Sequence, residues 1–572
     1  MEESNFRLKT SALLKKIWGY DSFRGIQEDI IESILDGKDT LGLMPTGGGK
    51  SITFQVPALM KEGVCIVITP LIALMKDQVV SLRKRGILAS AIYTGMSHDE
   101  ILKTLENAIY GGVKILYVSP ERLSSELFQI KFSHMNISFI VVDEAHCICQ
   151  WGYDFRPSYL EIAQIRDIHP SVPVLALTAT ATPAVVDDIQ ERLLFKKKNV
   201  FKMSFERKNL AYVVRNTQNK LGEMIHILNS VEGAAIVYVH ARKTSKEVAE
   251  ELNKMGVTST FFHAGLDNVD KDMRQRQWQN DEIRVMVATN AFGMGIDKPN
   301  VRLVIHYDIP DSIEAYFQEA GRAGRDGKKS YAVMLYNNND HGKLLRRISD
   351  TFPEKEYIRN VYEDIASFYQ MAVGDGKGCI YEFNNEKFCT IFKHHPIKVE
   401  SSLHILQRAG YLHYDVNQNG NARFMFTISR NELYKLDDVT EKCNEVVMCL
   451  LRNYPGIFSE YQYIDEAFIA HKTGLQEHQV YLLLKYLSGT HMASFIPRRN
   501  TPYIMYARDR VETERVVLST EVYDHRKEEY TKRINAMLEY VANSQVCRSR
   551  QLLRYLGEKN DHDCHICDVC RG

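Results

Sequence analysis

Two adjacent carboxylates, Asp143 and Glu144, are the residues whose placement first suggests chemistry. They directly follow the apolar run FIVV, which is typical of a parallel strand buried on both faces. In doubly wound folds, the carboxyl ends of such strands line the ligand site. A carboxylate pair at this place suits an ATPase, in which one holds Mg²⁺ and its neighbour orients or deprotonates the attacking water. We therefore predict that Asp143 and Glu144 divide these two roles.

A glycine-rich segment earlier in the chain supplies a matching phosphate site. The run PTGGGKS stands between a short apolar strand pattern at 40–44 and a helical pattern. Backbone N–H groups of such a loop bind phosphate oxygens, Lys50 reaches the β and γ phosphates, and the Ser51 hydroxyl can ligate Mg²⁺. Met44 takes the place of the usual first glycine, and a purely structural glycine turn is the alternative. The predicted nucleotide-binding residues of the loop are Thr46, Gly47, Gly48, Gly49, Lys50 and Ser51.

Strand and helix patterns alternate on both sides of these motifs, which predicts parallel sheets. Apolar runs start at Val64, Val113 and Val172, and, after a charged and irregular stretch at 196–208, at Ala234, Val257, Ile283 and Val301. The second series has no phosphate loop, but it ends in QEAGRAGRDG, where Arg322 and Arg325 stand one helical turn apart. Two such arginines can reach across a cleft to the γ-phosphate. A solvated basic helix end is the simpler alternative.

Three polar residues and an aromatic segment follow either the carboxylates or the next apolar run. His146, Thr178 and Thr180 are predicted to be coupling residues, with His146 counted among the catalytic residues, although ordinary polar groups satisfied at strand ends are the alternative. Shortly after the carboxylates come stacking side chains that suit nucleobases, with a packed lobe surface as the alternative: Trp151, Tyr153, Phe155 and Arg156.

The composition sets limits on the class of protein. A chain of 572 residues needs several cores, and 72 basic against 72 acidic residues leave no global positive field, so nucleic-acid binding must use local patches. The eleven cysteines and the absence of a secretory pattern at the N-terminus favour a reducing cytoplasm. No apolar run approaches the roughly 18 residues that cross a bilayer, so no membrane role is expected.

The motif series over residues 1 to about 345 resembles the RecQ family of superfamily 2 helicases. The matching segments are WGYDSFRGIQ, TPLIALMKDQV, SPERL, DEAH, QWGYDFRPSY, LTATAT, HAGL, ATNAFGMGIDKPNVRLVIHYDIP and QEAGRAGRDG. The resemblance implies that Tyr20 and Arg24 sandwich adenine and that Gln27 bonds to its edge. It also implies that Gly295 and Asp297 belong to the nucleotide site, where Asp297 contacts the ribose. In the second lobe it implies that Gln318 is catalytic, that Arg322 senses the γ-phosphate and that Arg325 is the arginine finger. The aromatic-rich loop, Gln150 to Tyr159, becomes the sensor of single-stranded DNA.

About 170 residues, Ile348 to Arg515, stand between the second lobe and the predicted zinc-binding helical subdomain, whereas the family usually passes almost directly from one to the other. Helical patterns are followed by two alternating stretches, 414–429 and 491–506, that we predict to be β-hairpins. The order resembles two winged helices, with Arg498 and Arg499 in a wing. Such modules bind DNA or only proteins. Because the family usually carries a winged helix after its zinc region, we hypothesise that these modules replace it.

Four cysteines near the C-terminus have the spacing of a structural metal site. Cys547, Cys564, Cys567 and Cys570 offer four soft thiolates, which suit tetrahedral zinc, and the same spacing occurs in the zinc subdomain of the family. His562 and His565 are competing ligands by type, but four cysteines already complete the shell.

The sequence therefore predicts an α/β protein with two RecA-like parallel-sheet lobes, winged-helix-like modules and a helical zinc-binding subdomain. The expected limits are 1–207, 208–347, 348–438, 439–515 and 516–572. The resemblance implies an ATP- and Mg²⁺-dependent 3′–5′ DNA helicase of recombination and repair. The protein is expected to be a monomer and to be located in the bacterial cytoplasm in association with the nucleoid. Expected partners are single-stranded and forked or tailed duplex DNA, with single-strand-binding or repair proteins. An RNA-directed remodeller and a nucleic-acid-binding scaffold with an inactive motor are the alternatives.

Overall fold

The chain forms two compact units in the computed structural model. The first unit comprises Met1–Thr94, Lys103–Leu345 and Tyr530–Gly572, and the second comprises Gly95–Leu102 and Arg346–Glu529. The structure describes residues 2–45, 47–93, 95–96, 98–149, 156–293, 298–415, 422–429, 432, 441–454, 456–458, 461–497 and 502–572. Among these residues, no helix has the length and apolar character that a membrane span requires.

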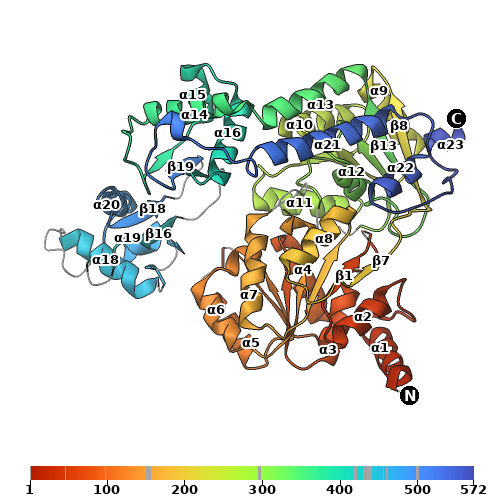
Figure 1. Cartoon of the computed structure of the whole chain (residues 1–572), viewed down its shortest axis with the longest axis horizontal. Coiled ribbons are helices and arrows are strands. Elements are labelled where there is room, and N and C mark those ends of the chain that lie inside the picture. Colours follow the sequence, from red (N-terminus) through yellow and green to blue (C-terminus); the bar gives the residue numbers. More distant parts are fainter. Residues whose placement is uncertain are drawn as a thin grey trace. The chain divides into compact units, whose positions relative to one another are not determined.

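Seven parallel strands build the sheet of the first lobe, in the order β3-β4-β2-β5-β6-β1-β7. The strands are β1 (Thr40–Leu43), β2 (Val64–Ile68), β3 (Ala89–Ile92), β4 (Ile115–Val118), β5 (Ile137–Val142), β6 (Val174–Thr178) and β7 (Val200–Lys202). Five of them are buried along their whole length, as expected for a sheet flanked by helices (Figure 1). The stretch at 196–208, predicted to be irregular, instead contributes β7 to the sheet edge.

The helices of this lobe connect the strands in βαβ fashion. They are α1 (Glu2–Trp18), α2 (Gln27–Leu35), α3 (Ile52–Met60), α4 (Ile72–Lys84), α5 (His98–Ile109), α6 (Glu126–Ser133), α7 (Ile162–Ile168) and α8 (Pro183–Arg192). Ile30, Phe54 and Met75 from three of them pack on the sheet residues Val67 and Val141 in one core. This core fixes the ends of β1 and β5, which carry the predicted nucleotide residues.

Six parallel strands build the second lobe, in the order β10-β11-β9-β12-β13-β8. The strands are β8 (Leu210–Asn216), β9 (Ala234–Tyr238), β10 (Ser259–Phe262), β11 (Val285–Ala288), β12 (Val301–His306) and β13 (Ser330–Tyr336). The helices are α9 (Lys220–Ser230), α10 (Arg242–Lys254), α11 (Asn268–Gln279), α12 (Ile313–Ala320) and α13 (Asn338–Thr351). The prediction of two parallel-sheet lobes is therefore confirmed.

The C-terminal helices pack against the second lobe. They are α21 (Asp524–Ala542), α22 (Arg548–Tyr555) and α23 (Asp568–Arg571). Tyr540 of α21 lies with its ring centroid 5.3 Å from that of Tyr316 on α12. Asp568, at the start of α23, accepts a hydrogen bond of 3.0 Å from the backbone N–H of Val214 on β8. The cysteine-bearing segment is thus attached to the edge strand of the second sheet.

Two small antiparallel sheets organise the second unit. One has the order β14-β19-β15 and the other β17-β16-β18. The first contains β14 (Ile380–Glu382), β15 (Leu412–Asp415) and β19 (Tyr503–Tyr506), with α14 (Lys355–Phe368), α15 (Asn385–Phe392) and α16 (Pro396–Arg408). The second contains β16 (Arg423–Phe426), β17 (Gln462–Tyr463) and β18 (Ala493–Ile496), with α18 (Glu441–Asn453), α19 (Glu466–Thr473) and α20 (Glu477–Gly489). We call the module that contains β14, β15 and β19 the outer winged-helix module, and the module that contains β16, β17 and β18 the inner winged-helix module.

The inner module is inserted into the outer module between β15 and β19, and we call the resulting change of strand partners the strand exchange. β16 follows β15 in the chain but pairs with β17 and β18, and β19 follows β18 but pairs with β14 and β15. The predicted hairpins at 414–429 and 491–506 are therefore wrong, and the sheets do not follow the predicted boundary at residue 438. The physical reason is packing, because Phe424 and Phe426 of β16 enter the core of the inner module. Arg498 and Arg499 lie outside the described residues, on the connection from one sheet to the other.

Candidate nucleotide site and zinc centre

The glycine-rich loop joins β1 to α3 and has the backbone that phosphate binding needs. Gly47 and Gly49 have φ values of 82° and 78°, a region in which a side chain would be strained. A Cβ atom on Gly49 would also collide with the side-chain amide of Gln27. Ser51 is the N-cap residue of α3, so its hydroxyl stands where backbone N–H groups face the loop. Thr46 lies outside the described residues.

Lys50 faces the carboxylate pair at the end of β5. Its Nζ atom lies 3.2 Å from Glu144 Oε1 and 4.0 Å from Asp143 Oδ1. Both carboxylates are mostly shielded from solvent, with exposed side-chain fractions of 16% for Asp143 and 12% for Glu144. The sequence prediction that these residues meet is therefore confirmed, although they are 94 positions apart in the chain.

Burial and mutual charge shift the ionisation of this trio. Burial raises the pKa of the Asp143 carboxyl to about 6, although Lys50 opposes the shift. Burial acts in the same direction on Glu144, but Lys50 and His146 outweigh it, so the pKa of Glu144 lies below its ordinary value. Burial would lower the pKa of Lys50, yet the two carboxylates raise it. The site thus holds a permanent cation beside one ionised carboxylate and one that titrates near pH 6.

A chain of polar contacts leads from Glu144 to the end of β6. Glu144 has left-handed backbone angles, φ 48° and ψ 46°, and its N–H donates to Asp143 Oδ1 over 3.0 Å. His146 Nδ1 lies 3.5 Å from Glu144 Oε2 and 2.9 Å from Thr178 Oγ1. The Thr178 hydroxyl in turn donates to the Thr180 carbonyl over 3.3 Å. The three polar residues named from sequence are therefore brought together behind the carboxylates.

The predicted adenine-binding residues form one group at the start of α2, of which Gln27 is the first residue. Gln27 Nε2 donates to the carbonyls of Gly48 and Gly49, each over 3.1 Å, and its Oε1 accepts from the Arg24 N–H over 2.8 Å. The Arg24 guanidinium lies 5.8 Å from the centroid of the Tyr20 ring, which is 49% exposed. The group therefore presents an aromatic face and a cation beside the phosphate loop. Gly295 and Asp297 lie outside the described residues.

The two arginines of the second lobe face the phosphate loop, but not from a helix. Helix α12 ends at Ala320, so Arg322 and Arg325 stand in the turns that follow it. The Arg325 side chain lies against Gly47, where an added Cβ would be 3.4 Å from Arg325 Cγ. Arg322 is buried and donates to the Gly293 carbonyl. Gln318 is half-buried on α12.

Sequence reasoning missed the residues that hold this arginine turn. Arg207 donates to the carbonyls of Gly321, Ala323 and Gly324 over 3.2, 2.8 and 3.1 Å. Asn209 Nδ2 donates to the Gly324 carbonyl over 2.7 Å. Both lie in or beside the stretch that looked irregular, more than 100 positions away. No spacing pattern could have pointed to them.

The described part of the aromatic-rich loop begins at Arg156. Gln150, Trp151, Tyr153 and Phe155 lie outside the described residues, so their roles stay predictions. Arg156 precedes the 3₁₀ helix Pro157–Glu161, and its N–H donates to the Cys147 carbonyl over 3.0 Å. Tyr159, in that helix, donates from its hydroxyl to the Asp143 carbonyl over 2.9 Å. The loop is therefore connected directly to the strand end that carries the carboxylates.

The four C-terminal cysteines meet as predicted. The sulfur atoms of Cys547, Cys564, Cys567 and Cys570 all lie within 4.8 Å of one another. Sulfur atoms about 2.3 Å from a tetrahedral zinc ion have similar mutual separations, so the cluster fits zinc. His562 is turned away, with 65% of its side chain exposed and Nε2 2.8 Å from Glu206 Oε1. Arg548 pairs with Asp568 over 3.1 Å and links the site to its supporting helices.

Comparison with known proteins matches these elements domain by domain. Family models match at residues 24–189 for the DEAD/DEAH box helicase, 217–327 for the helicase conserved C-terminal domain, 424–497 for the RecQ helicase winged-helix domain of Bacteroidota, and 507–571 for RecQ zinc-binding. The third match coincides with the inner module, from β16 to β18.

Curated relatives match a little more than half of the chain. The ATP-dependent DNA helicase RecQ of Pasteurella multocida is 42% identical over 340 residues, which are 59% of this chain and 54% of the relative. The RecQ helicase of Bacillus subtilis is 45% identical over 338 residues, 58% of this chain and 57% of the relative. The chain thus spans little more than half the length of these relatives. The DUF1998 helicase MrfA bound to DNA shares the fold, with a TM-score of 0.50 at 18% identity over 58% of this chain and 51% of MrfA.

Helicase lobes alone would not separate this chain from many other motors. Two further domains do so, because a RecQ winged-helix domain and a RecQ zinc-binding domain follow the lobes in the same chain. The zinc-binding match includes the four clustered cysteines. The chain therefore belongs to the RecQ family of helicases.

Proposed function

We propose that the protein is an ATP-dependent DNA helicase that moves 3′ to 5′ along single-stranded DNA and separates duplexes in recombination and repair. The observation that carries this proposal is the trio at the first lobe, in which Lys50 lies 3.2 Å from Glu144 and 4.0 Å from Asp143. Arg325 of the second lobe lies against the same phosphate loop. Lys50, the two carboxylates and Arg325 in this arrangement support a working motor rather than an inactive scaffold.

The residues divide the chemistry of hydrolysis. Lys50 leaves its ion pair with Glu144 to contact the β and γ phosphates, and Ser51 and Asp143 hold Mg²⁺. Glu144, released from Lys50, takes the proton of the attacking water. Arg325 supplies positive charge to the transition state, with Arg322 beside it, when the two lobes close on ATP. In this scheme ATP binding itself frees the base, because Lys50 changes partner.

The loop from Gln150 to Tyr159 links hydrolysis to DNA. Its described end bonds to the Asp143 carbonyl through Tyr159, over 2.9 Å. A shift of the loop on binding DNA would therefore move the strand end that carries both carboxylates. We propose this connection as the route by which single-stranded DNA stimulates turnover, with Trp151 and Phe155 as the stacking residues.

Strand displacement on forked, 3′-tailed and 5′-tailed DNA tests the proposal, with Lys50→Ala as the inactive control. We expect ATP-dependent unwinding of forked and 3′-tailed substrates and none of 5′-tailed DNA. Lys50→Ala should bind DNA and unwind nothing. Unwinding from a 5′ tail would overturn the polarity, and turnover by Lys50→Ala would overturn the site.

RNA is the competing substrate, because one relative at 41% identity over 345 residues is named a putative ATP-dependent RNA helicase. Matched DNA and RNA oligonucleotides decide the question through ATPase stimulation. The RecQ domains favour DNA, so we expect DNA to be the stronger activator. The family match to Bacteroidota supports a bacterial source, and we propose that the protein acts in the cytoplasm at the nucleoid. We further propose a monomer that meets single-strand-binding or repair proteins at its substrates.

A further inference from the structure

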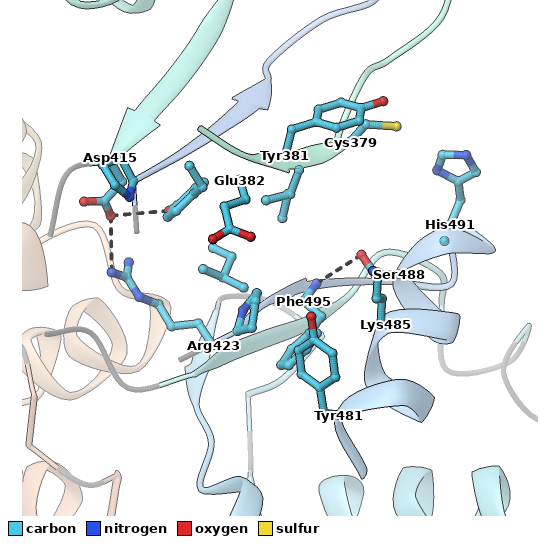
Figure 2. A pocket seen from close by; sticks show the side chains of 16 residues that line it. Cys379, Tyr381, Glu382, Asp415, Arg423, Tyr481, Lys485, Ser488, His491 and Phe495 are labelled. Atoms are coloured by element: carbon cyan, nitrogen blue, oxygen red, sulfur yellow. Dashed lines mark hydrogen bonds and ion pairs between the residues drawn. The ribbon is translucent and has the colours of Figure 1, made fainter. Parts of the chain in front are cut away.

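A cavity of about 500 Å³ lies between the outer and the inner winged-helix module. One wall comes from β14, β15 and β19, and the other from α20, β16 and β18 (Figure 2). It lies in the second unit, whereas the nucleotide trio and the zinc cysteines belong to the first unit. Neither hydrolysis nor zinc binding accounts for it.

The strand exchange fixes the two walls to each other. Asp415 ends β15 and Arg423 begins β16, and their side chains form an ion pair of 3.4 Å across the cavity edge. Tyr503, at the start of β19, donates from its hydroxyl to the same Asp415 carboxylate over 3.3 Å. The two connections between the modules thus begin and end at the cavity. These contacts at the cavity edge distinguish it from a chance gap between two loosely linked domains.

The lining combines aromatic faces with charges of both signs. Tyr481 of α20 lies edge-on against Phe495 of β18, with ring centroids 6.0 Å apart, and Tyr381 of β14 stacks on Tyr369, 4.3 Å away. Phe495 is buried in the core of the inner module, so the half-buried Tyr381 and Tyr481 supply the aromatic surface of the cavity. Glu382 directs its carboxylate toward the middle of the cavity, and Lys485 lies at the opposite wall (Figure 2). Glu382 and Lys485 are both exposed. Planar faces, a central acceptor and a cation are the three features that a nucleotide needs.

We propose that this cavity binds one unpaired nucleotide of single-stranded DNA. The base stacks on the aromatic lining, the Glu382 carboxylate accepts a hydrogen bond from the exocyclic amino group of cytosine or adenine, and Lys485 contacts the neighbouring phosphate. Thymine lacks that amino group and should bind less tightly. A peptide is the less suitable occupant, because a carboxylate in the middle of the cavity opposes the apolar anchor side chains that peptides bury. The inference goes beyond the proposed motor and depends on it only for the choice of DNA as substrate.

Two substitutions of exposed residues test the site in the full-length protein. Affinities for oligo-dC and oligo-dT are measured without ATP for wild type, Glu382→Ala and Lys485→Glu. Matched controls are Glu445→Ala and Lys442→Glu, since both residues are exposed on α18 and neither lines the cavity. A charge-assisted hydrogen bond should give wild type a preference of about tenfold for oligo-dC. Glu382→Ala should abolish that preference, and Lys485→Glu should lower the affinity for both oligonucleotides about fivefold or more.

Cross-linking provides the second readout. An oligo-dC strand with one 5-iodocytosine should, on irradiation, attach to peptides that contain Tyr381, Tyr481 or Phe495. Equal affinities of all variants for both strands, or cross-links confined to the first unit, would overturn the proposal. DNA-stimulated ATPase is measured in parallel. Its absence from wild type would overturn the proposed helicase function, while the ratio of oligo-dC to oligo-dT affinity would still decide the cavity.

Discussion

Removing the inner module should leave the outer module folded, because the strands that flank the excision are already paired. Asp415 of β15 stands opposite Tyr503 of β19 in an antiparallel register. A two-residue Asn-Gly turn closes such a pair, so residues 416–502 can be replaced by Asn-Gly with Asp415 and Tyr503 as the flanking pair of the sheet β14-β19-β15. The replacement removes β16, β17 and β18 together, and with them the whole core of the inner module.

A second variant, the deletion of residues 439–515, serves as the comparison. It follows the boundary that two consecutive modules would have. It removes β19 and therefore Ile504 and Tyr506, which are both 0% exposed. Each fully buried side chain of this size contributes about 1.5–3 kcal/mol, so the outer module loses about 3–6 kcal/mol. That loss is comparable with the total stability of a small domain, about 5–15 kcal/mol. The outer module should unfold in this variant.

Limited proteolysis and thermal unfolding separate the two cases, with the ATPase activity of the motor as the internal control. The 416–502 replacement should keep a protected fragment that begins near residue 346, and the 439–515 deletion should lose it. Both variants should retain basal ATPase activity, since the nucleotide residues belong to the other unit. The reverse outcome, with protection only in the 439–515 deletion, would show that β15 pairs with β16 and would refute the strand exchange.

Four further perturbations address the first unit. Glu144→Gln should lower kcat about 10²- to 10⁴-fold while binding of a fluorescent ATP analogue persists, whereas Glu126→Gln, exposed on α6, should change neither. Arg325→Ala should slow hydrolysis about 10³-fold or more, as measured by phosphate release, and a change below tenfold would exclude a finger. Because burial raises the pKa of Asp143 to about 6, protons should compete with Mg²⁺ below that pH. The half-saturating Mg²⁺ concentration for ATPase activity should then rise about tenfold per pH unit below 6 and stay constant above it. Cys567→Ser should release zinc and expose the C-terminal helices to protease, and full zinc content in that variant would contradict a four-cysteine site.

Much of the nucleotide site was predictable because its parts are local in sequence. The phosphate loop needs glycine at positions with positive φ, and both Gly47 and Gly49 have it. The carboxylates follow an apolar run that had to be a central strand, β5, buried along its whole length. Once both segments belong to one parallel sheet, the carboxyl ends of β1 and β5 lie at the same edge, and Lys50 meets Glu144.

The arginine turn shows where such reasoning stops. Spacing placed Arg322 and Arg325 on one face of a helix, but helix α12 ends at Ala320. Three backbone carbonyls in the turn accept hydrogen bonds from Arg207, which comes from a segment with no recognisable pattern. A turn that depends on a donor more than 100 residues away is decided by tertiary contacts, so sequence could name the arginines and not their geometry.

The wing strands were predicted with the wrong partners. Alternation of apolar and polar residues indicates that one face of a strand packs against a core, but it does not indicate which of two cores. The strand β16 follows β15 of the outer module but belongs to the inner module, and β19 follows β18 of the inner module but belongs to the outer module. The consequence concerns binding. Two modules in series would share one connection, whereas here the chain passes between the modules twice and the Asp415–Arg423 ion pair joins them at the cavity. Walls that are fixed before a nucleotide arrives spare the entropy of ordering them, so the exchange favours tight binding at that place. The same restriction predicts that a break in either connection weakens the cavity even when both cores stay folded.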